Sequence, residues 1–160
     1  MASPVVRTAA PAAAPIAVSV NADGIRSPVA RAKLAEVARM ALRAEGARAA
    51  MVSVTLLSSA AMARLNERHL QHRGPTDVIS FGFRAVPGGP VVGDIYIAPA
   101  VARTNALDAK VSVREELVRL VVHGVLHVMG HDHPTDATRV QSAMWKRQEV
   151  LVRRARAVAG

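Results

Sequence analysis

Residues 123–133 read His123-Gly124-Val125-Leu126-His127-Val128-Met129-Gly130-His131-Asp132-His133, and no other segment says more about this chain. Four of the six histidines of the protein fall within these eleven residues. The first part of this segment belongs to an apolar run from Leu117 to Met129. Apart from the two histidines, Arg119 is the one charged or titratable residue in that run. A helix that is apolar on nearly every side is typical of a protein interior, so we expect this helix to be buried.

The spacing of the histidines predicts a metal site. His123 and His127 are four residues apart, so on a helix they project from one face with Cβ atoms about 6 Å apart. Gly130 is expected to end the helix in a left-handed conformation and to turn the chain back, which brings His133 toward the same point. Imidazole nitrogens are good zinc ligands, and three of them leave a fourth position for water. Such an open site is the catalytic kind, because zinc lowers the pKa of that water toward neutrality.

Two histidines at helical spacing are also compatible with a purely structural role, in which they bond to each other or to the backbone. The glycine and the third histidine favour a metal, because HxxxHxxGxxH is the spacing of the zinc ligands in metzincin proteases. One position argues against a protease. The residue after the first histidine is the general-base glutamate in those enzymes, whereas here it is Gly124, which cannot accept a proton.

Upstream of the histidines, the sequence predicts the start of their helix, and downstream it predicts a second helix. The histidine helix is expected to begin after Ser112, whose side chain suits a cap, with Glu115 three residues later, and to end near Met129. The second helix is expected from about Pro134 to Arg156. Together these two helices occupy most of the C-terminal part of the chain.

The N-terminal part of the chain predicts strands and two further helices. Alternating or β-branched runs indicate four strands, over residues 16–21, 51–57, 77–83 and 93–98. One helix is expected from Ser27 and Pro28 to the residue before Gly46, and another from Ser59 to about Leu70. These elements indicate a single α+β domain with a roughly four-stranded mixed sheet packed by helices, one of which is a zincin-like metal helix.

Residues 1–15 are rich in alanine and proline, and we expect them to form a disordered extension before a domain that spans residues 16–157. Prolines 4, 11 and 15 interrupt the apolar core that a signal peptide would need, so a cytoplasmic protein is expected.

The composition limits which metal ligands and which partners the protein can have. The 160 residues contain no cysteine, so any metal must be bound by histidines and carboxylates. The apolar runs are far too short to cross a bilayer. The formal net charge of +9 favours a polyanionic partner such as nucleic acid, although an arginine- and alanine-rich coding bias would give the same excess. With four aromatic residues in the chain, we expect contacts to phosphates rather than to stacked bases.

Four motifs, in this order, make the chain similar to a known family. They are Leu65-Asn66, Pro-Thr-Asp-Val-Ile-Ser-Phe at 75–81, Gly-Asp-Ile at 93–95, and the histidine segment. Together they resemble the YbeY family of bacterial endoribonucleases, from about residue 16 onward. The resemblance implies a cytoplasmic, zinc-dependent enzyme that cleaves single-stranded RNA. It further implies maturation of ribosomal RNA, especially the 3′ end of the small-subunit RNA, and a part in ribosome quality control, with ribosomal RNA and ribosomal particles as partners.

The resemblance also implies roles for individual residues. The three metal ligands of the family carry over to His123, His127 and His133, which would bind one Zn²⁺ per chain. His131 stands where the family often has tyrosine, and we expect it to be a neighbour of the site rather than a ligand. Asp132 matches the aspartate that precedes the last histidine of the family.

The chain departs from the family at Leu70, where many members have an arginine implicated in function. Arg68 and Arg73 flank that position, and Arg73 is the substitute that we predict to contact substrate. Asp132 is the carboxylate predicted to take part in proton transfer, or else to orient a histidine ligand. Asp132 and Arg73 are therefore the candidate catalytic residues.

Other polar residues each have two interpretations. Thr76 and Asp77 either line the substrate cleft or form the turn into the strand. Glu116 either supports the ligands or pairs with an arginine, and the pair is favoured.

His69 and His72 are expected in a solvated loop. A solvated helix end, with RNA contact as the second interpretation, is expected of Arg153, Arg154 and Arg156.

Two other classes of function stay open. One is a metal-dependent hydrolase acting on peptides, against which Gly124 argues. The other is a non-catalytic ribosome-associated binding protein. The open three-histidine site argues against it, although a metal can also serve folding alone.

Overall fold

The chain is described by a computed structural model, which covers residues 15–70, 74, 76–83 and 86–159. The predicted extension, residues 1–15, lies outside this range except for Pro15. In chain order the elements are β1 (Ile16–Asn21), α1 (Arg31–Ala44), β2 (Ala50–Leu56), α2 (Ser59–Leu70), β3 (Val78–Phe83), β4 (Val91–Ile97), α3 (Pro99–Ala109), α4 (Val113–Val128), the short 3₁₀ helix η1 (Ala137–Gln141) and α5 (Ala143–Ala159).

The four strands form one mixed sheet in the order β1-β2-β4-β3. β2 pairs parallel with β1 on one side and with β4 on the other, and β3 pairs antiparallel with β4. The predicted α+β class with a four-stranded mixed sheet is therefore confirmed. No helix within the described ranges is both long and apolar enough to span a membrane.

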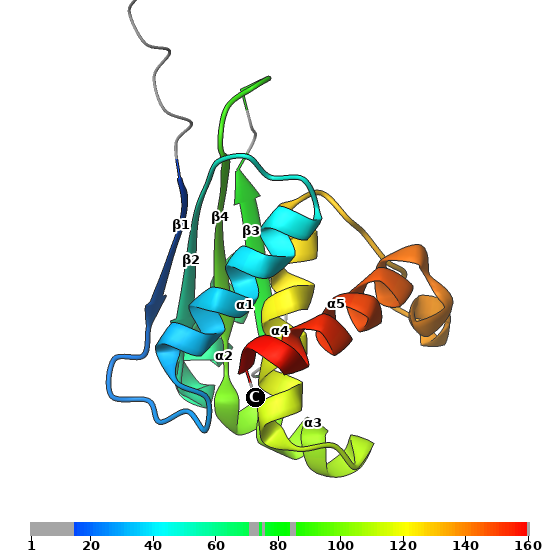
Figure 1. Ribbon diagram of the computed structural model, residues 1–160. Helices are drawn as coiled ribbons and strands as arrows, with labels where there is room; N and C mark the ends of the chain where they lie inside the picture. The colour runs from blue at the N-terminus through cyan, green and yellow to red at the C-terminus, as the bar shows by residue number, and fades with distance from the viewer. Residues whose placement is uncertain (1–14, 71–73, 75, 84–85, 160) are drawn as a thin grey trace, which may run out of the picture.

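The main core lies between one face of the sheet and the helices α1 and α4 (Figure 1). Alternate residues of a strand point to opposite faces, so Ile95 and Ile97 of β4 enter this core and both are fully buried. α5 lies across α4 (Figure 1), also contacts α1, and adds Leu151 to the same core. α4 is thus covered by the sheet on one side and by α5 on the other, which explains its nearly uniform apolar sequence.

The opposite face of the sheet carries a smaller cluster. Met62 of α2 packs there with Ile79 of β3 and with Ala98, which precedes α3. Tyr96 is paired with Ile79 across the two strands and joins the same cluster. α2 is in this way fixed to the sheet on the side away from α4.

Two glycines let the end of α4 lie directly on the sheet. Gly82 and Gly93 are opposite each other on β3 and β4, and Val128 of α4 sits over both. A Cβ atom at Gly93 would be 2.5 Å from Val128 Cγ1, closer than non-bonded carbon atoms approach. The absence of side chains at these two positions therefore sets how closely the histidine-bearing end of α4 approaches the β3–β4 pair.

The predicted start of the first helix is wrong. α1 begins at Arg31 after Ala30, and no side chain caps it. Ser27 instead closes a local turn, in which its hydroxyl accepts a hydrogen bond from the Val29 N–H at 3.1 Å and donates one to the Val29 carbonyl at 2.7 Å. A serine that satisfies its own turn does not need a helix beside it.

The helix predicted from Pro134 to Arg156 is two elements. Asp136 caps η1 by accepting the Thr138 N–H at 2.9 Å, and Ser142 caps α5 by accepting the Trp145 N–H at 3.1 Å. Two capping side chains in succession end one helix and begin another.

α3, at Pro99–Ala109, is not predicted from the sequence. Its buried face consists of Pro99, Ala102 and Ala106. Because these side chains are small, the helix lacks the stripe of large apolar residues from which amphipathic helices are recognised.

Candidate metal centre

The structure brings together the three predicted ligands, His123, His127 and His133. One ring nitrogen from each residue lies within 4.8 Å of the other two. The ring centroids are 4.6 Å apart for His123 and His127, 5.1 Å for His123 and His133, and 5.0 Å for His127 and His133. All three side chains are half-buried, so the group is held by the protein yet reachable from solvent.

A helix-ending turn places His133 against the other two histidines. Gly130 has a φ of 98°, which side chains other than glycine rarely adopt. The His131 N–H donates to the Leu126 carbonyl, and the Gly130 N–H donates to the His127 carbonyl. The donor–acceptor distance is 2.9 Å in both hydrogen bonds. This is the Schellman pattern of a helix C-terminus. The predicted reversal at Gly130 is confirmed, and it turns the chain back over the last turn of α4.

Each of the three rings has its Nδ1 bonded to an oxygen. His123 Nδ1 lies 2.7 Å from Gln148 Oε1, His127 Nδ1 lies 3.0 Å from the His131 carbonyl, and His133 Nδ1 lies 2.7 Å from the Pro134 carbonyl. Amide oxygens only accept hydrogen bonds, so Nδ1 must carry the proton in every ring. Nε2 is then the nitrogen with the free lone pair. The protein has fixed all three tautomers in the form that binds a metal through Nε2.

The electrostatics of the site favour the neutral form of His123 and His127. Burial, together with the adjacent His123 and His133, lowers the pKa of His127 to about 4. Burial also lowers the pKa of His123, partly offset by its hydrogen bond to Gln148. Both imidazoles therefore hold no second proton at neutral pH, and a metal ion would not have to displace one.

Gln148 is the residue that supports the site and that sequence reasoning missed. It comes from α5, is 1% exposed, and reaches His123 across 25 residues of sequence. No local pattern could have identified it, because glutamine at a helical position has no fixed partner in the sequence.

His131 lies beside the site without joining the ligand group, as predicted. Its Nε2 is 2.9 Å from Glu45 Oε2 at the end of α1, and the other oxygen of Glu45 accepts a hydrogen bond from Arg147 of α5. The backbone carbonyl of His131 meanwhile accepts the His127 Nδ1–H. Glu45 thus connects the turn at His131 to both α1 and α5.

Gly124 faces the sheet and has no room for a side chain. A Cβ atom there would lie 2.6 Å from Ile95 Cγ2. The glutamate of the HExxH motif is therefore excluded by the core as well as absent from the sequence.

Of the two candidate catalytic residues, Asp132 lies within the described residues. Asp132 is exposed, and its Oδ1 accepts the N–H of His133 at 2.8 Å, so it borders a ligand without contacting the ring. Arg73 lies outside the described residues, as does His72. Arg68 is exposed on α2. The catalytic roles of Asp132 and Arg73 stay predictions.

Glu116 and Asp77 each make structural contacts: Glu116 forms an ion pair, and Asp77 accepts hydrogen bonds in the turn before β3. Glu116 pairs with Arg119 at 3.2 Å, which confirms the expected ion pair. Asp77 accepts the Val78 N–H at 2.8 Å and the Asn105 side-chain amide at 3.1 Å, so it forms the turn into β3 and binds α3 to it.

His69 was expected in a loop, but it lies in α2. There it is exposed and contacts Phe81 edge-on, with ring centroids 5.5 Å apart.

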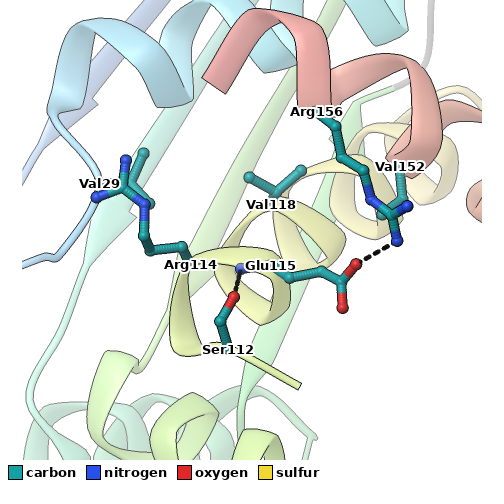
Figure 2. Close-up of a pocket in the computed structure, with 7 residues that line it drawn as sticks. All are labelled: Val29, Ser112, Arg114, Glu115, Val118, Val152 and Arg156. Carbon is teal, nitrogen blue, oxygen red and sulfur yellow. Dashed lines mark hydrogen bonds and ion pairs between the residues drawn. The ribbon is translucent and has the colours of Figure 1, made fainter. Parts of the chain in front are cut away.

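Two cavities accompany α4. A narrow one adjoins the histidines and is lined by His123, His133, Arg139, Ser142, Met144, Trp145 and Gln148. A larger one of about 320 Å³ lies at the other end of α4, where Glu115 and Arg156 form an ion pair of 2.6 Å across its side (Figure 2). Ser112, the N-cap of α4, also lines it, so this cavity is separate from the metal centre.

Comparison with known proteins identifies the relatives of this chain. The model of the family described as Endoribonuclease YbeY matches residues 19–156. The Endoribonuclease YbeY of Mycolicibacterium gilvum is 40% identical over 124 residues, which cover 71% of this chain and 68% of the relative. That of Chlorobaculum parvum is 33% identical over 125 residues, which cover 78% of this chain and 86% of the relative.

A solved structure shares the architecture. The solution structure of TM1509 from Thermotoga maritima superimposes with a TM-score of 0.63 at 26% identity, covering 88% of this chain and 90% of that one. The family match, the two relatives and the three converging histidines lead to one conclusion. The chain belongs to the endoribonuclease YbeY family, a family of RNA-cleaving hydrolases.

Proposed function

We propose that this protein is a zinc-dependent endoribonuclease that cleaves single-stranded RNA in the cytoplasm, during maturation of the 3′ end of small-subunit ribosomal RNA and in ribosome quality control. The observation that carries the proposal is the arrangement of His123, His127 and His133, each with Nδ1 bonded to an oxygen. Membership of the YbeY family supports RNA as the substrate.

The donor set fits zinc. Three neutral imidazoles without a thiolate or carboxylate suit zinc among the divalent ions, and three protein ligands are the number found in catalytic zinc sites. Bound zinc supplies a Lewis acid and acidifies water near neutral pH. His123 and His127 would hold it from a buried helix, and His133 from the turn after Gly130.

The remaining chemistry must come from groups outside α4. Gly124 offers no base, and the core leaves no space for one. Asp132, one residue before a ligand, is the carboxylate that we propose for proton transfer. Arg73 is the cation that we propose to contact a substrate phosphate.

The experiment is to incubate metal-replete protein with single-stranded RNA, with duplex RNA, with a precursor of small-subunit ribosomal RNA and with a peptide library. We expect cleavage of the single-stranded RNA and of the precursor near its 3′ end, and no cleavage of peptides. His127→Ala should abolish RNA cleavage, while His69→Ala, which changes an exposed histidine on α2, should not. Peptide cleavage, or unchanged RNA cleavage by His127→Ala, would contradict the proposal.

A further inference from the structure

An arginine and a tryptophan stand together beside the metal centre. Arg139 is on η1, and its guanidinium carbon lies 5.7 Å from the centre of the Trp145 ring on α5. Both residues line the narrow cavity that His123 and His133 also line. A cation within about 6 Å of an indole face is attracted by the ring electrons. Trp145 therefore helps to keep the Arg139 guanidinium at the edge of the metal centre.

The charge of Arg139 is not compensated as the charges of the neighbouring arginines are. Arg119 pairs with Glu116 and Glu149, and Arg147 pairs with Glu45. Arg139 is exposed, and within the part of the chain that the structure describes no carboxylate forms an ion pair with it. Its N–H groups are thus available to an anion.

The backbone around Arg139 is fixed by its own hydrogen bonds. The Ser142 hydroxyl donates to the Arg139 carbonyl at 2.6 Å and accepts the Trp145 N–H at 3.1 Å. Asp136 caps the other end of η1. Ser142 in this way links the backbone of Arg139 to that of Trp145.

We propose that Arg139, held over Trp145, binds a phosphate of a single-stranded RNA lying across the metal centre. A guanidinium stacked on a ring still presents its N–H edge, which matches two phosphate oxygens at once. The cavity itself has a volume of about 10 Å³, room for roughly one water molecule, so the strand would lie across its opening. This inference rests on the proposed function and adds a substrate-binding residue that the sequence pattern does not mark.

The test measures binding separately from cleavage. A fluorescein-labelled 2′-O-methyl oligouridylate is titrated with the zinc-loaded protein, and anisotropy is followed over a series of salt concentrations. Gel electrophoresis of the oligonucleotide checks that it stays intact during the titration. The variants are Arg139→Gln, Arg139→Lys and the control Arg31→Gln, which removes an exposed charge from the start of α1. Because Trp145 is the one tryptophan of the chain, its emission reports on the same surface.

Arg139→Gln should weaken binding and lower the slope of log affinity against log salt by about 0.7, the value for one phosphate contact on a single strand. Arg139→Lys should keep the slope of the wild type, because the charge is kept. Arg31→Gln should keep both affinity and slope. RNA should change the emission of Trp145 in the wild type.

Equal affinity and slope in Arg139→Gln and Arg31→Gln would overturn the inference, and so would a wild type that fails to bind the RNA. A separate cleavage assay with zinc distinguishes the two proposals. Binding that depends on Arg139 without any cleavage would reject the proposed function and keep this site. Cleavage that is indifferent to Arg139→Gln, with unchanged binding, would reject this site alone.

Discussion

Gln148 on α5 fixes the orientation of His123 on α4, because its Oε1 accepts a hydrogen bond from His123 Nδ1 at 2.7 Å. Gln148 is 1% exposed, so water cannot readily replace it. α5 is in this way coupled to the candidate metal centre. The other two rings are held by backbone carbonyls, which leaves Gln148 as the one side chain among the described residues that bonds a ligand Nδ1.

Gln148→Ala should lower the zinc affinity by about 10- to 100-fold, because partners of ligand histidines contribute that much to metal binding. Gln148→Glu should retain the affinity, since a carboxylate oxygen also accepts from Nδ1. Competition with a chromophoric chelator measures both. Gln141→Ala, at an exposed position on η1, is the control, and an affinity of Gln148→Ala equal to that control would contradict the assigned role.

Zinc content should distinguish ligands from neighbours among the histidines. The wild type should bind one zinc ion per chain, and the double variant His127→Ala/His133→Ala should bind none. His131→Ala should still bind one, because its ring contacts Glu45 and only its backbone carbonyl serves the site. Elemental analysis after dialysis decides this. Undiminished zinc in the double variant would reject the three-histidine site.

Gly124→Ala should destabilise the protein, although alanine is the better helix former by about 1 kcal/mol. The added methyl group would lie 2.6 Å from Ile95 Cγ2, and overpacking of a core typically costs about 1–3 kcal/mol. We expect a net loss of about 1 kcal/mol in the free energy of unfolding, measured by urea denaturation. The loss should disappear when Gly124→Ala is made in an Ile95→Ala background; an equal loss in both backgrounds would show that the close contact is not its cause.

The stability of the metal-free protein should fall as the pH is lowered from about 6.5 to about 4. Burial, with the two adjacent histidines, lowers the pKa of His127 to about 4, whereas the unfolded chain takes up this proton near pH 6.5. In that window the unfolded state binds more protons than the folded state, so the free energy of unfolding rises with pH. His123, whose pKa burial also lowers, acts in the same direction.

Thermal unfolding of the wild type in EDTA at several pH values gives this dependence, and His127→Gln isolates the share of one ring. The variant should have a shallower decline between pH 6.5 and pH 4. Parallel curves for the two proteins would contradict the assignment.

Asp132 and Arg73 should affect cleavage more than metal binding. Asp132→Asn keeps an oxygen that can accept the His133 N–H but removes the charge, so RNA cleavage should fall while the fold and the zinc content stay unchanged. Arg73→Ala should likewise slow cleavage with little change in zinc affinity. Single-turnover rates and zinc content of both variants are the measurement, and wild-type rates in both would show that neither residue supplies the missing chemistry.

The three-histidine cluster and most of the helices and strands could be predicted from local rules. Residues four apart share a face of any helix, and Gly130 adopts a backbone conformation that few other residues tolerate, so the spacing of the histidines and this glycine together predicted the cluster. Alternating or β-branched runs predicted all four strands to within two residues of their ends. α3 was not predicted because its buried face consists of small residues. α5 begins later than the helix predicted from about Pro134, because Ser142 caps a separate helix start.

The surroundings of the ligands depended on the tertiary structure. Gln148 and Arg139 reach the histidines from α5 and η1, and Glu45 reaches His131 from the end of α1. Such contacts join residues that are far apart in the chain, and a glutamine, an arginine or a glutamate has the same helical periodicity whether or not it meets a partner. Spacing along a helix fixes which residues can bind one metal ion, whereas the packing of α1, η1 and α5 around that helix fixes which nitrogen each imidazole presents and which cation stands beside them.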